Sequence, residues 1–487
     1  MNEMVHLTID NKKIKVPAGT TLMEAASTLG IVIPAMCHNG DLPHFASCMV
    51  CVVKDEQSGR MIPSCSVRVA NGMHIITLGE EVREARKTAL DLLLSDHTGD
   101  CEAPCQRSCP AHMDIPLMNR HLAAGELRQA YEVVIRDIAL PSILGRICPA
   151  PCEGACRRKS VDEPVAICLL KRVAGDHYLE EWQAADPVRP PDMTIRQVAV
   201  IGSGPHGLSA AWYLQQYGYQ CTVFDKNELP GGALRYSVSR HILPEEILDQ
   251  EIDRIRKAGV IFKMNADISR EEIENLRPRF DALILPLEKA PKMAIRAAAI
   301  GKEEAIRTHQ LLSGLPVAGE KRIFNSHFGR LDADEAQEYL KESVPGARLA
   351  PSGGMPAGFS REEAMAEAAR CLHCDCRKLD NCKLRLYSDE YEAEQKRFIG
   401  LERKKIRKIV QHDTVIYEPE KCIKCGICVR ITEKHREVLG LTFIGRGFDV
   451  QVGVPFSESL KQGLTHTALE AADACPTGAL ARKEEKQ

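Results

Sequence analysis

Cysteine is the residue type most able to carry chemistry in this chain, and its spacing is the first signal. The 487-residue sequence contains 20 cysteines, and all but Cys168 and Cys221 fall into short-spaced groups. The N-terminus lacks the apolar stretch of a secretory signal, so we expect a cytoplasmic protein with reduced thiols. Closely spaced reduced cysteines indicate metal or cluster ligation rather than disulfides.

The first group supplies four thiolates within one short segment: Cys37, Cys48, Cys51 and Cys65. Four thiolates suit a [2Fe-2S] cluster or structural zinc, but zinc sites usually pair two short loops and only one is present here. We therefore expect [2Fe-2S]. The surrounding β-hairpin and helix pattern resembles a plant-type ferredoxin domain. The cysteine spacing resembles the N-terminal domain of the large iron–sulfur subunit of complex I and of iron hydrogenases.

Two further groups follow, and they comprise His97, Cys101, Cys105 and Cys109, then Cys148, Cys152 and Cys156. The string CPAPCEGAC that begins at Cys148 resembles a motif of the glutamate synthase small subunit family. That family folds both groups into one helical domain with two [4Fe-4S] clusters. The resemblance implies that Cys105 and Cys156 serve one cluster, while Cys109, Cys148 and Cys152 serve the other.

The opening of this region departs from the family, because His97-x3-Cys101 stands in place of its usual start. This pair instead resembles the histidine-ligated cluster that follows the two-iron domain in complex I. A neutral imidazole can replace a thiolate, although His97 could also be a surface histidine at a helix end. The family's fourth ligand to its second cluster, a Gln or Glu, falls near Lys171, a poor ligand. Cys168, one turn earlier, could replace it or could be a buried apolar cysteine; Cys221 is expected in a strand core.

A strand, a Gly-rich turn and a helix begin at Val198, in a G-x-G-x-x-G pattern that suits the pyrophosphate of a dinucleotide. The predicted cofactor-binding residues are Gly202, Gly204 and Gly207, with Asp225 where a ribose-binding acid belongs, and Gly231 and Gly232 in a loop that resembles the flavin-side loop of the glutamate synthase family.

That family carries a second Gly-rich fold for NADPH, and this fold is missing here. The strand DALIL (281–285) runs almost directly into 291–305, which resembles the family's last flavin-domain helix. Pro286-Leu287-Glu288 stand where a Gly-Asp pair normally holds the flavin. FAD is therefore either retained without a nucleotide partner or lost from a scaffold domain. We do not expect NAD(P)H oxidation on this chain, because hydride transfer needs nicotinamide stacked on flavin.

Two more cysteine groups lie toward the C-terminus, and their members are Cys371, Cys374, Cys376 and Cys382, then Cys422, Cys425, Cys428 and Cys475. The first four could hold zinc, but we expect a [4Fe-4S] cluster because the neighbouring sites are iron–sulfur. The second four form a complete ferredoxin-type set. Their segments KCIKCGICVR and ACPTGAL resemble the ferredoxin-like region of complex I's large subunit and of formate dehydrogenases.

Several elements must position these groups. Alternating Val5, Leu7 and Ile9 predict a strand, Thr21-x-x-Glu24 predicts a capping box, and residues 80–95 predict a helix. The expected apolar stripe of that helix comprises Val82, Ala85, Ala89, Leu92 and Leu93. The prolines of 183–193 predict a linker.

The predicted fold is a multidomain combination of α+β and α/β parts. Its domains are a β-grasp [2Fe-2S] ferredoxin-like domain (1–78), a helical 4Fe-4S domain (79–182), a truncated Rossmann-like FAD/dinucleotide-binding domain (194–312) and a C-terminal 4Fe-4S ferredoxin-like region (360–487).

The formal net charge is −3, which gives no reason to expect a nucleic acid as a binding partner. No stretch approaches the ~20 apolar residues of a membrane span. A basic run comprises Arg403, Lys404, Lys405, Arg407 and Lys408. It would be a solvated face or a docking site for an acidic partner such as ferredoxin.

No residue set resembles a nucleophile, a general base or a substrate pocket. One [2Fe-2S] and up to four [4Fe-4S] clusters, with FAD possible, instead indicate an electron relay. We expect an electron-transfer subunit of a multimeric NAD- or ferredoxin-linked oxidoreductase. The resemblances imply a flavin-bearing diaphorase subunit and a hydrogenase or formate dehydrogenase catalytic subunit as partners. The alternatives are an FAD-dependent NAD(P)H oxidoreductase that feeds its own clusters, and a zinc-binding scaffold.

Overall fold

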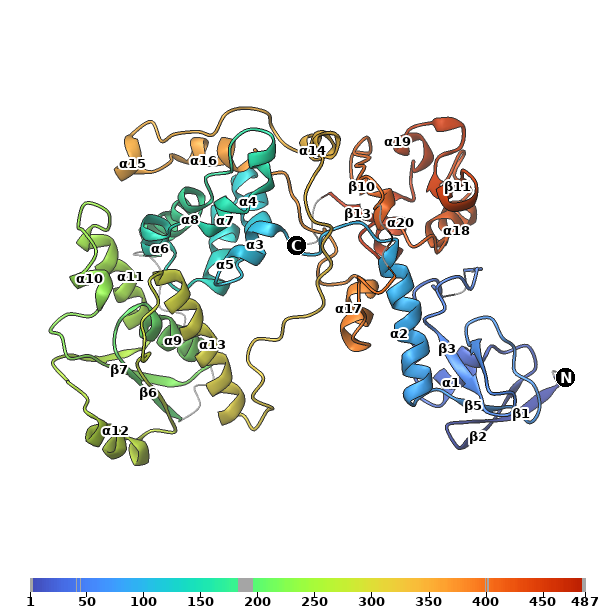
Figure 1. The fold of residues 1–487 in the computed structure, drawn as a ribbon, viewed down its shortest axis with the longest axis horizontal. Helices are drawn as coiled ribbons and strands as arrows, with labels where there is room; N and C mark the ends of the chain where they lie inside the picture. The colour runs from blue at the N-terminus through green and yellow to red at the C-terminus, as the bar shows by residue number, and fades with distance from the viewer. Residues whose placement is uncertain are drawn as a thin grey trace. The chain divides into compact units, whose positions relative to one another are not determined.

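The computed structural model describes residues 3–40, 42–43, 45–182, 196–398, 400 and 403–483 (Figure 1). The chain forms two compact units, each built from separate segments. The first unit contains Met1–Glu102, Ile323–Glu342 and Asp375–Gln487, and the second contains Ala103–Arg322 and Ser343–Cys374. The chain thus leaves the first unit after Glu102, returns to it for Ile323–Glu342, and belongs to it again from Asp375 onward. The predicted linker 183–193 lies outside the described residues.

The first unit opens with a five-stranded sheet in the order β2-β1-β5-β3-β4. Its strands are β1 (Met4–Ile9), β2 (Lys12–Pro17), β3 (Val52–Asp55), β4 (Arg60–Pro63) and β5 (His74–Ile76). The β1–β5 pair is parallel and the others are antiparallel, which is the β-grasp arrangement. Val5, Leu7 and Ile9 alternate inward as predicted. The predicted capping box opens α1 (Leu22–Thr28), where Thr21 and Glu24 exchange side-chain-to-backbone hydrogen bonds.

The predicted helix over 80–95 is present as α2 (Glu80–Ser95), but its buried face differs from the expected stripe. Leu92 is 52% exposed, whereas Leu90 and Leu94 are fully buried. Arg86 explains the rotation, because its guanidinium is buried and donates to the backbone oxygen of Val52 at 3.1 Å. A charged residue therefore occupies part of the inward face.

The rest of the first unit consists of short helices and two small hairpins. The helices are α14 (Ala333–Leu340), α17 (Lys383–Glu390), α18 (Ile427–Lys434), α19 (Leu460–Gly463) and α20 (Ala468–Ala474). The antiparallel pairs are β10 (Val415–Tyr417) with β13 (Leu480–Arg482), and β11 (Thr442–Ile444) with β12 (Gln451–Gly453). Apolar side chains of α17, α18, α19, α20 and both hairpins share one core with Leu90 and Leu94 of α2.

The second unit joins a helical part to a parallel sheet. The helices of the first part are α3 (Pro104–Ser108), α4 (Ile115–Ala123), α5 (Leu127–Asp137), α6 (Pro141–Ile147), α7 (Pro151–Gly154), α8 (Ile167–Trp182), α15 (Gly354–Ala357) and α16 (Arg361–Ala368). Figure 1 shows α16 beside α4, although they lie far apart in the sequence.

The sheet of the second unit has the order β8-β7-β6-β9, with all strands parallel. Its strands are β6 (Gln197–Ile201), β7 (Gln220–Phe224), β8 (Ile261–Lys263) and β9 (Ala282–Ile284), and its helices are α9 (Pro205–Gln216), α10 (Ala233–Tyr236), α11 (Glu245–Lys257), α12 (Arg270–Leu276) and α13 (Ala294–Leu312). Figure 1 shows α9 and α13 side by side. They pack so closely that a Cβ on Gly301 would lie 2.1 Å from the backbone oxygen of His206. Among the described residues, no helix has both the length and the apolarity that a membrane span requires.

Candidate iron–sulfur sites

The first candidate site lies at one end of the β-grasp sheet and contains Cys37, Cys48, Cys51 and Cys65, each at most 3% exposed. Hydrogen bonds from Cys48 and Cys65 hold the pKa of the Cys37 thiol well below its usual range. Cys51 is hydrogen-bonded in turn to Cys65, so the four sulfurs lie close together. Ser64 fixes two of the loops, because its hydroxyl and its N–H both donate to the backbone oxygen of Cys51.

The second candidate site brings Cys101 together with Cys376 and Cys382, which follow the whole second unit in the sequence. His97 shortly precedes Cys101 in the chain and is included as the proposed fourth ligand. The N–H of Cys376 donates to the backbone oxygen of Cys101 at 2.9 Å. Burial, and then the charges of Cys376 and Cys101, raise the pKa of Cys382 to about 12. All four residues belong to the first unit.

The structure groups Cys371, Cys374, Cys376 and Cys382 differently from the expected single set, because Cys371 and Cys374 line a cavity with Cys105 and Cys156, whereas Cys376 lies beside Cys101. The second unit ends at Cys374, and the first unit resumes at Asp375. The C-x2-C-x-C-x5-C string is therefore divided between the two units. Spacing alone favoured a single site, but the junction between the units falls inside the string.

His97 has the properties of a ligand rather than of a surface histidine. Its Nδ1 atom is buried and has no hydrogen-bond partner among the described residues. Burial, and then the charge of Lys421, lower the pKa of the imidazole to about 4. The ring is therefore neutral at neutral pH, with a nitrogen lone pair that no protein group uses, as ligation requires.

The third candidate site lies in the second unit and collects Cys105, Cys156, Cys371 and Cys374 around a small cavity lined mainly by apolar side chains. Two buried arginines hold the flanking segments together. Arg158 donates to the backbone oxygen of Arg370 at 2.6 Å and pairs with Asp162. Arg370 in turn pairs with Asp162 and Glu367. The pair Cys371 and Cys374 is thereby placed beside Cys105 and Cys156.

The fourth candidate site contains Cys109, Cys148, Cys152 and Cys168, contributed by the ends of α3 and α6 and by α7 and α8. A hydrogen bond with Cys168, and then burial, raise the pKa of Cys148. The N–H of Cys168 donates to the Glu153 carboxylate at 2.9 Å. Cys168 thus lies beside the other cysteines, in the place where the sequence left a fourth ligand open. Cys221 is fully buried in the sheet core, as predicted.

Lys171 is the charged neighbour of this fourth site. It is only 3% exposed, and its Nζ lies 3.9 Å from the Sγ of Cys168. Burial disfavours the ammonium, but the charges of Cys168, Cys148, Cys109 and Cys152 outweigh burial and hold its pKa above the usual value. Among the described residues no ion pair joins this buried ammonium to a carboxylate. The four cysteines, as thiolates bound to a cluster, would supply the negative charge that it needs.

The fifth candidate site contains Cys422, Cys425, Cys428 and Cys475, beside α18, α20 and the β10–β13 hairpin. Burial, and then the charge of Cys475, raise the pKa of Cys422 to about 11. The N–H of Lys424 points at the Sγ of Cys422 at 3.3 Å. Gly426 has a φ of +76°, and a Cβ there would lie 2.5 Å from the ring of Phe45, so a side chain does not fit.

The Gly-rich turn of the second unit offers more to a diphosphate than to a ribose. Gly202 has a φ of +98°, and the space beside the Cα atoms of Gly202 and Gly204 is open. The Asp225 carboxylate, however, already accepts hydrogen bonds from the N–H and hydroxyl of Ser203, each at 2.6 Å, and from Asn227. The Gly231–Gly232 loop lies against this turn, because the N–H of Gly231 donates to Ser203.

The basic run in the first unit is engaged in internal ion pairs. These are Arg403 with Glu335, Lys404 with Asp96, Lys405 with Asp334, Arg407 with Glu420, and Lys408 with Glu342. Its charges are therefore largely compensated within the unit.

Within the described ranges, no three His, Cys, Asp or Glu side chains form a group that could hold a single metal ion. An iron–sulfur cluster separates its protein ligands, because they bind different irons.

Four segments of the chain match known families. Residues 2–79 match a 2Fe-2S iron–sulfur cluster binding domain, and 81–183 match dihydropyrimidine dehydrogenase domain II, a 4Fe-4S cluster domain. Residues 200–255 match an NAD(P)-binding Rossmann-like domain, and 413–481 match the ferredoxin-like domain of NADH-quinone oxidoreductase subunit 3. The chain is therefore a multi-cluster iron–sulfur electron-transfer protein with a Rossmann-like domain, which confirms the predicted fold class.

Individual relatives are subunits of oxidoreductases. The chain is 37% identical to the NADPH-Fe(3+) oxidoreductase subunit beta of Geobacter sulfurreducens over 38% of its length and 28% of the relative's. It is 33% identical to the NADP(+)-dependent formate dehydrogenase subunit beta of Moorella thermoacetica, over 38% of this chain and 29% of the relative. It is 30% identical to the NAD-dependent dihydropyrimidine dehydrogenase subunit PreT of Escherichia coli O157:H7, over 61% of this chain and 65% of the relative.

The chain thus spans less than a third of the length of the first two relatives. Among solved structures, an NAD+-reducing [NiFe]-hydrogenase aligns with 98% of this chain and 87% of its own, at 12% identity and a TM-score of 0.38. A similarity this weak does not establish a shared arrangement.

Proposed function

We propose that this chain carries five iron–sulfur clusters and passes single electrons between them. One pattern supports the proposal: every cysteine except Cys221, together with His97, can be assigned to one of five sets of four. Four ligands are what a [2Fe-2S] or a [4Fe-4S] cluster takes from a protein. Because no cysteine other than Cys221 is left over, cluster ligation explains these groups better than five unrelated cases of buried cysteines that pack together.

The proposed assignments follow the five candidate sites. The [2Fe-2S] cluster is held by Cys37, Cys48, Cys51 and Cys65. The four [4Fe-4S] clusters are held by His97, Cys101, Cys376 and Cys382; by Cys105, Cys156, Cys371 and Cys374; by Cys109, Cys148, Cys152 and Cys168; and by Cys422, Cys425, Cys428 and Cys475.

The unused Nδ1 of His97 and the thiolate-facing ammonium of Lys171 support two of these assignments. The N–H of Lys424 supports a third, because it points at the ligand sulfur of Cys422 and would favour the thiolate over the thiol.

A dinucleotide cofactor would be held by the Rossmann-like domain, and FAD is the one that the sequence resemblance implies. Gly202, Gly204 and Gly207, with the Gly231–Gly232 loop, would bind its diphosphate at the start of α9. Bound FAD would exchange electron pairs for single electrons. Asp225 would bind its ribose only after giving up hydrogen bonds to Ser203.

The chain works in this proposal as a subunit, because the relatives that it matches are subunits of oxidoreductases. The proposed complex is a cytoplasmic NAD- or ferredoxin-linked oxidoreductase. Its partners are a flavin-bearing diaphorase subunit and a catalytic subunit of the hydrogenase or formate dehydrogenase type.

Electron paramagnetic resonance on the anaerobically purified, fully reduced chain tests the proposal. Each reduced cluster contributes one unpaired electron, so spin integration should approach about five spins per chain. Two spins or fewer would refute a continuous relay. Added NAD(P)H should leave the isolated chain oxidised, and rapid reduction by NAD(P)H would instead support a self-contained oxidoreductase.

A further inference from the structure

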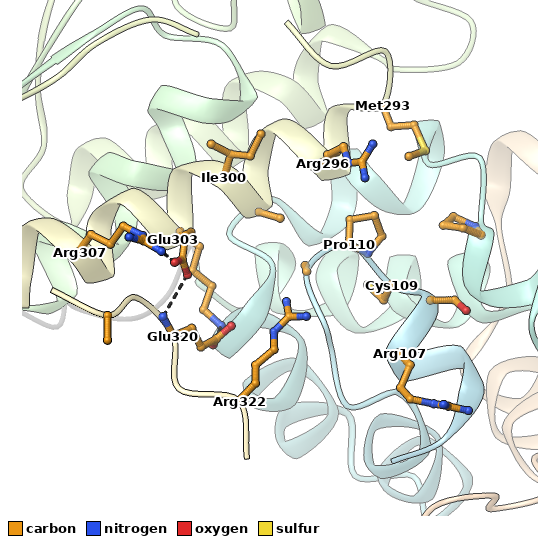
Figure 2. Close-up of a pocket in the computed structure, with 16 residues that line it drawn as sticks. Arg107, Cys109, Pro110, Met293, Arg296, Ile300, Glu303, Arg307, Glu320 and Arg322 are labelled. Carbon is orange, nitrogen blue, oxygen red and sulfur yellow. Dashed lines mark hydrogen bonds and ion pairs between the residues drawn. The ribbon is translucent and has the colours of Figure 1, made fainter. Parts of the chain in front are cut away.

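An open cavity of about 680 Å³ lies in the second unit, between α13 and the turn that carries Cys109 and Pro110 (Figure 2). Cavities of ~300–1,000 Å³ are typical of small-molecule sites. Figure 2 shows Arg296 and Arg322 turned toward the side where Pro110 and Cys109 lie. The cavity is thus large enough for a ligand of nucleotide size.

Basic side chains dominate the lining: Arg107, Arg296, Lys302, Arg307 and Arg322 stand against two carboxylates, Glu303 and Glu320. Two of these cations are paired. Lys302 lies 2.6 Å from Glu320 and 2.7 Å from Asp137, and Arg307 lies 2.8 Å from Glu303.

Three cations remain uncompensated. Within the part of the chain that the structure describes, Arg107, Arg296 and Arg322 form no ion pair with a carboxylate, and the Nε of Arg107 is buried without a hydrogen-bond partner. The basic run at 403–408 differs, since each of its cations has a carboxylate partner. Three guanidinium groups around one cavity therefore offer unused donors and unused charge to an anion.

Guanidinium groups bind phosphate oxygens in a bidentate geometry, and several of them suit a ligand with more than one negative charge. We propose that this cavity binds a phosphorylated small molecule of nucleotide size, whose phosphates lie between Arg296 and Arg322, with Arg107 adding positive charge to the lining. The site is separate from the Gly-rich turn, whose glycines do not line it.

A consequence for electron transfer rests on the proposed function. Cys109 lines the cavity and is a ligand in the fourth candidate site. A polyanion bound beside it would disfavour the added electron, so ligand binding would lower the midpoint potential of that cluster.

Isothermal titration calorimetry on the full holo-chain, with ADP and inorganic pyrophosphate as probes, tests the binding. In the double variant Arg296→Ala/Arg322→Ala, the Kd for both probes should rise roughly tenfold or more. The matched control, Arg270→Ala/Arg279→Ala, removes two exposed charges of the same unit outside the cavity and should leave the Kd unchanged.

Two results would overturn the site: equal binding by the double variant and the wild type, or citrate binding as tightly as pyrophosphate. A second measurement concerns the fourth cluster: its midpoint potential is compared with and without ADP. If the purified chain bound ADP normally but contained no fourth cluster, the proposed function would be refuted. The proposed phosphate site would still stand.

Discussion

Replacement of Lys171 by methionine should make the fourth cluster harder to reduce. The side chain is buried, and its ammonium lies 3.9 Å from the Sγ of Cys168 and faces the other three cysteines of the set. Reduction adds one negative charge to the cluster, and a fixed positive charge beside it stabilises that charge. Methionine has a similar length and no charge, so the substitution removes mainly the electrostatic contribution.

The size of the effect follows from Coulomb's law. The added electron is spread over the cluster, so its mean distance from Nζ is roughly twice the contact to Cys168. At about 8 Å and an effective dielectric constant of about 20, the interaction is about 2 kcal/mol. For a one-electron couple this equals about 90 mV, so the midpoint potential should fall by roughly that amount.

Potentiometric titration followed by electron paramagnetic resonance measures this shift. Lys171→Arg keeps the charge and should stay close to the wild-type potential. Iron and sulfide content should be equal in all three proteins, which separates a shifted cluster from a lost one. If the fully loaded Lys171→Met protein titrated at the wild-type potential, or above it, the role of this charge would be refuted.

Three further predictions concern the ligand sets. Cys168→Ser should remove about four irons per chain, while Cys221→Ser should remove none; equal iron in both would exclude Cys168 as a ligand. His97→Cys should keep its cluster at a lower midpoint potential, because a thiolate replaces a neutral imidazole, and an unchanged potential would count against ligation by His97. Anaerobic removal of iron by a chelator should lower the Tm of both units, since both depend on bound clusters; an unchanged Tm would show that the protein folds without them.

Local patterns in the sequence predicted local structure well. The alternation of Val5, Leu7 and Ile9 and the Thr21–Glu24 capping box depend on neighbouring residues only, and both are present. The Gly-rich turn and the missing second nucleotide fold were also readable, because β9 leads through a short segment into α13. The stripe of α2 was less predictable, since Arg86 on its inward face is satisfied by the backbone of Val52 from another element.

Long-range pairing was the part that spacing could not supply. A short loop such as Cys371-x2-Cys374 offers two ligands, and any other segment of the fold can complete the set. The structure completes it with Cys105 and Cys156. The sequence nevertheless contained a signal. His97 and Cys101 lacked two further cluster ligands, and so did Cys105 and Cys156. The four cysteines at 371–382 could supply these four missing ligands. The insertion of the second unit between Glu102 and Asp375 explains why these partners lie so far apart in the sequence.

The most direct test of the relay is the content of iron, acid-labile sulfide, zinc and flavin in the anaerobically purified chain. One [2Fe-2S] and four [4Fe-4S] clusters predict about 18 irons and a matching amount of sulfide per chain, with negligible zinc. One flavin per chain would add the Rossmann-like domain to the redox sites. Iron near six per chain would leave only two clusters, and zinc in place of iron would contradict the account entirely.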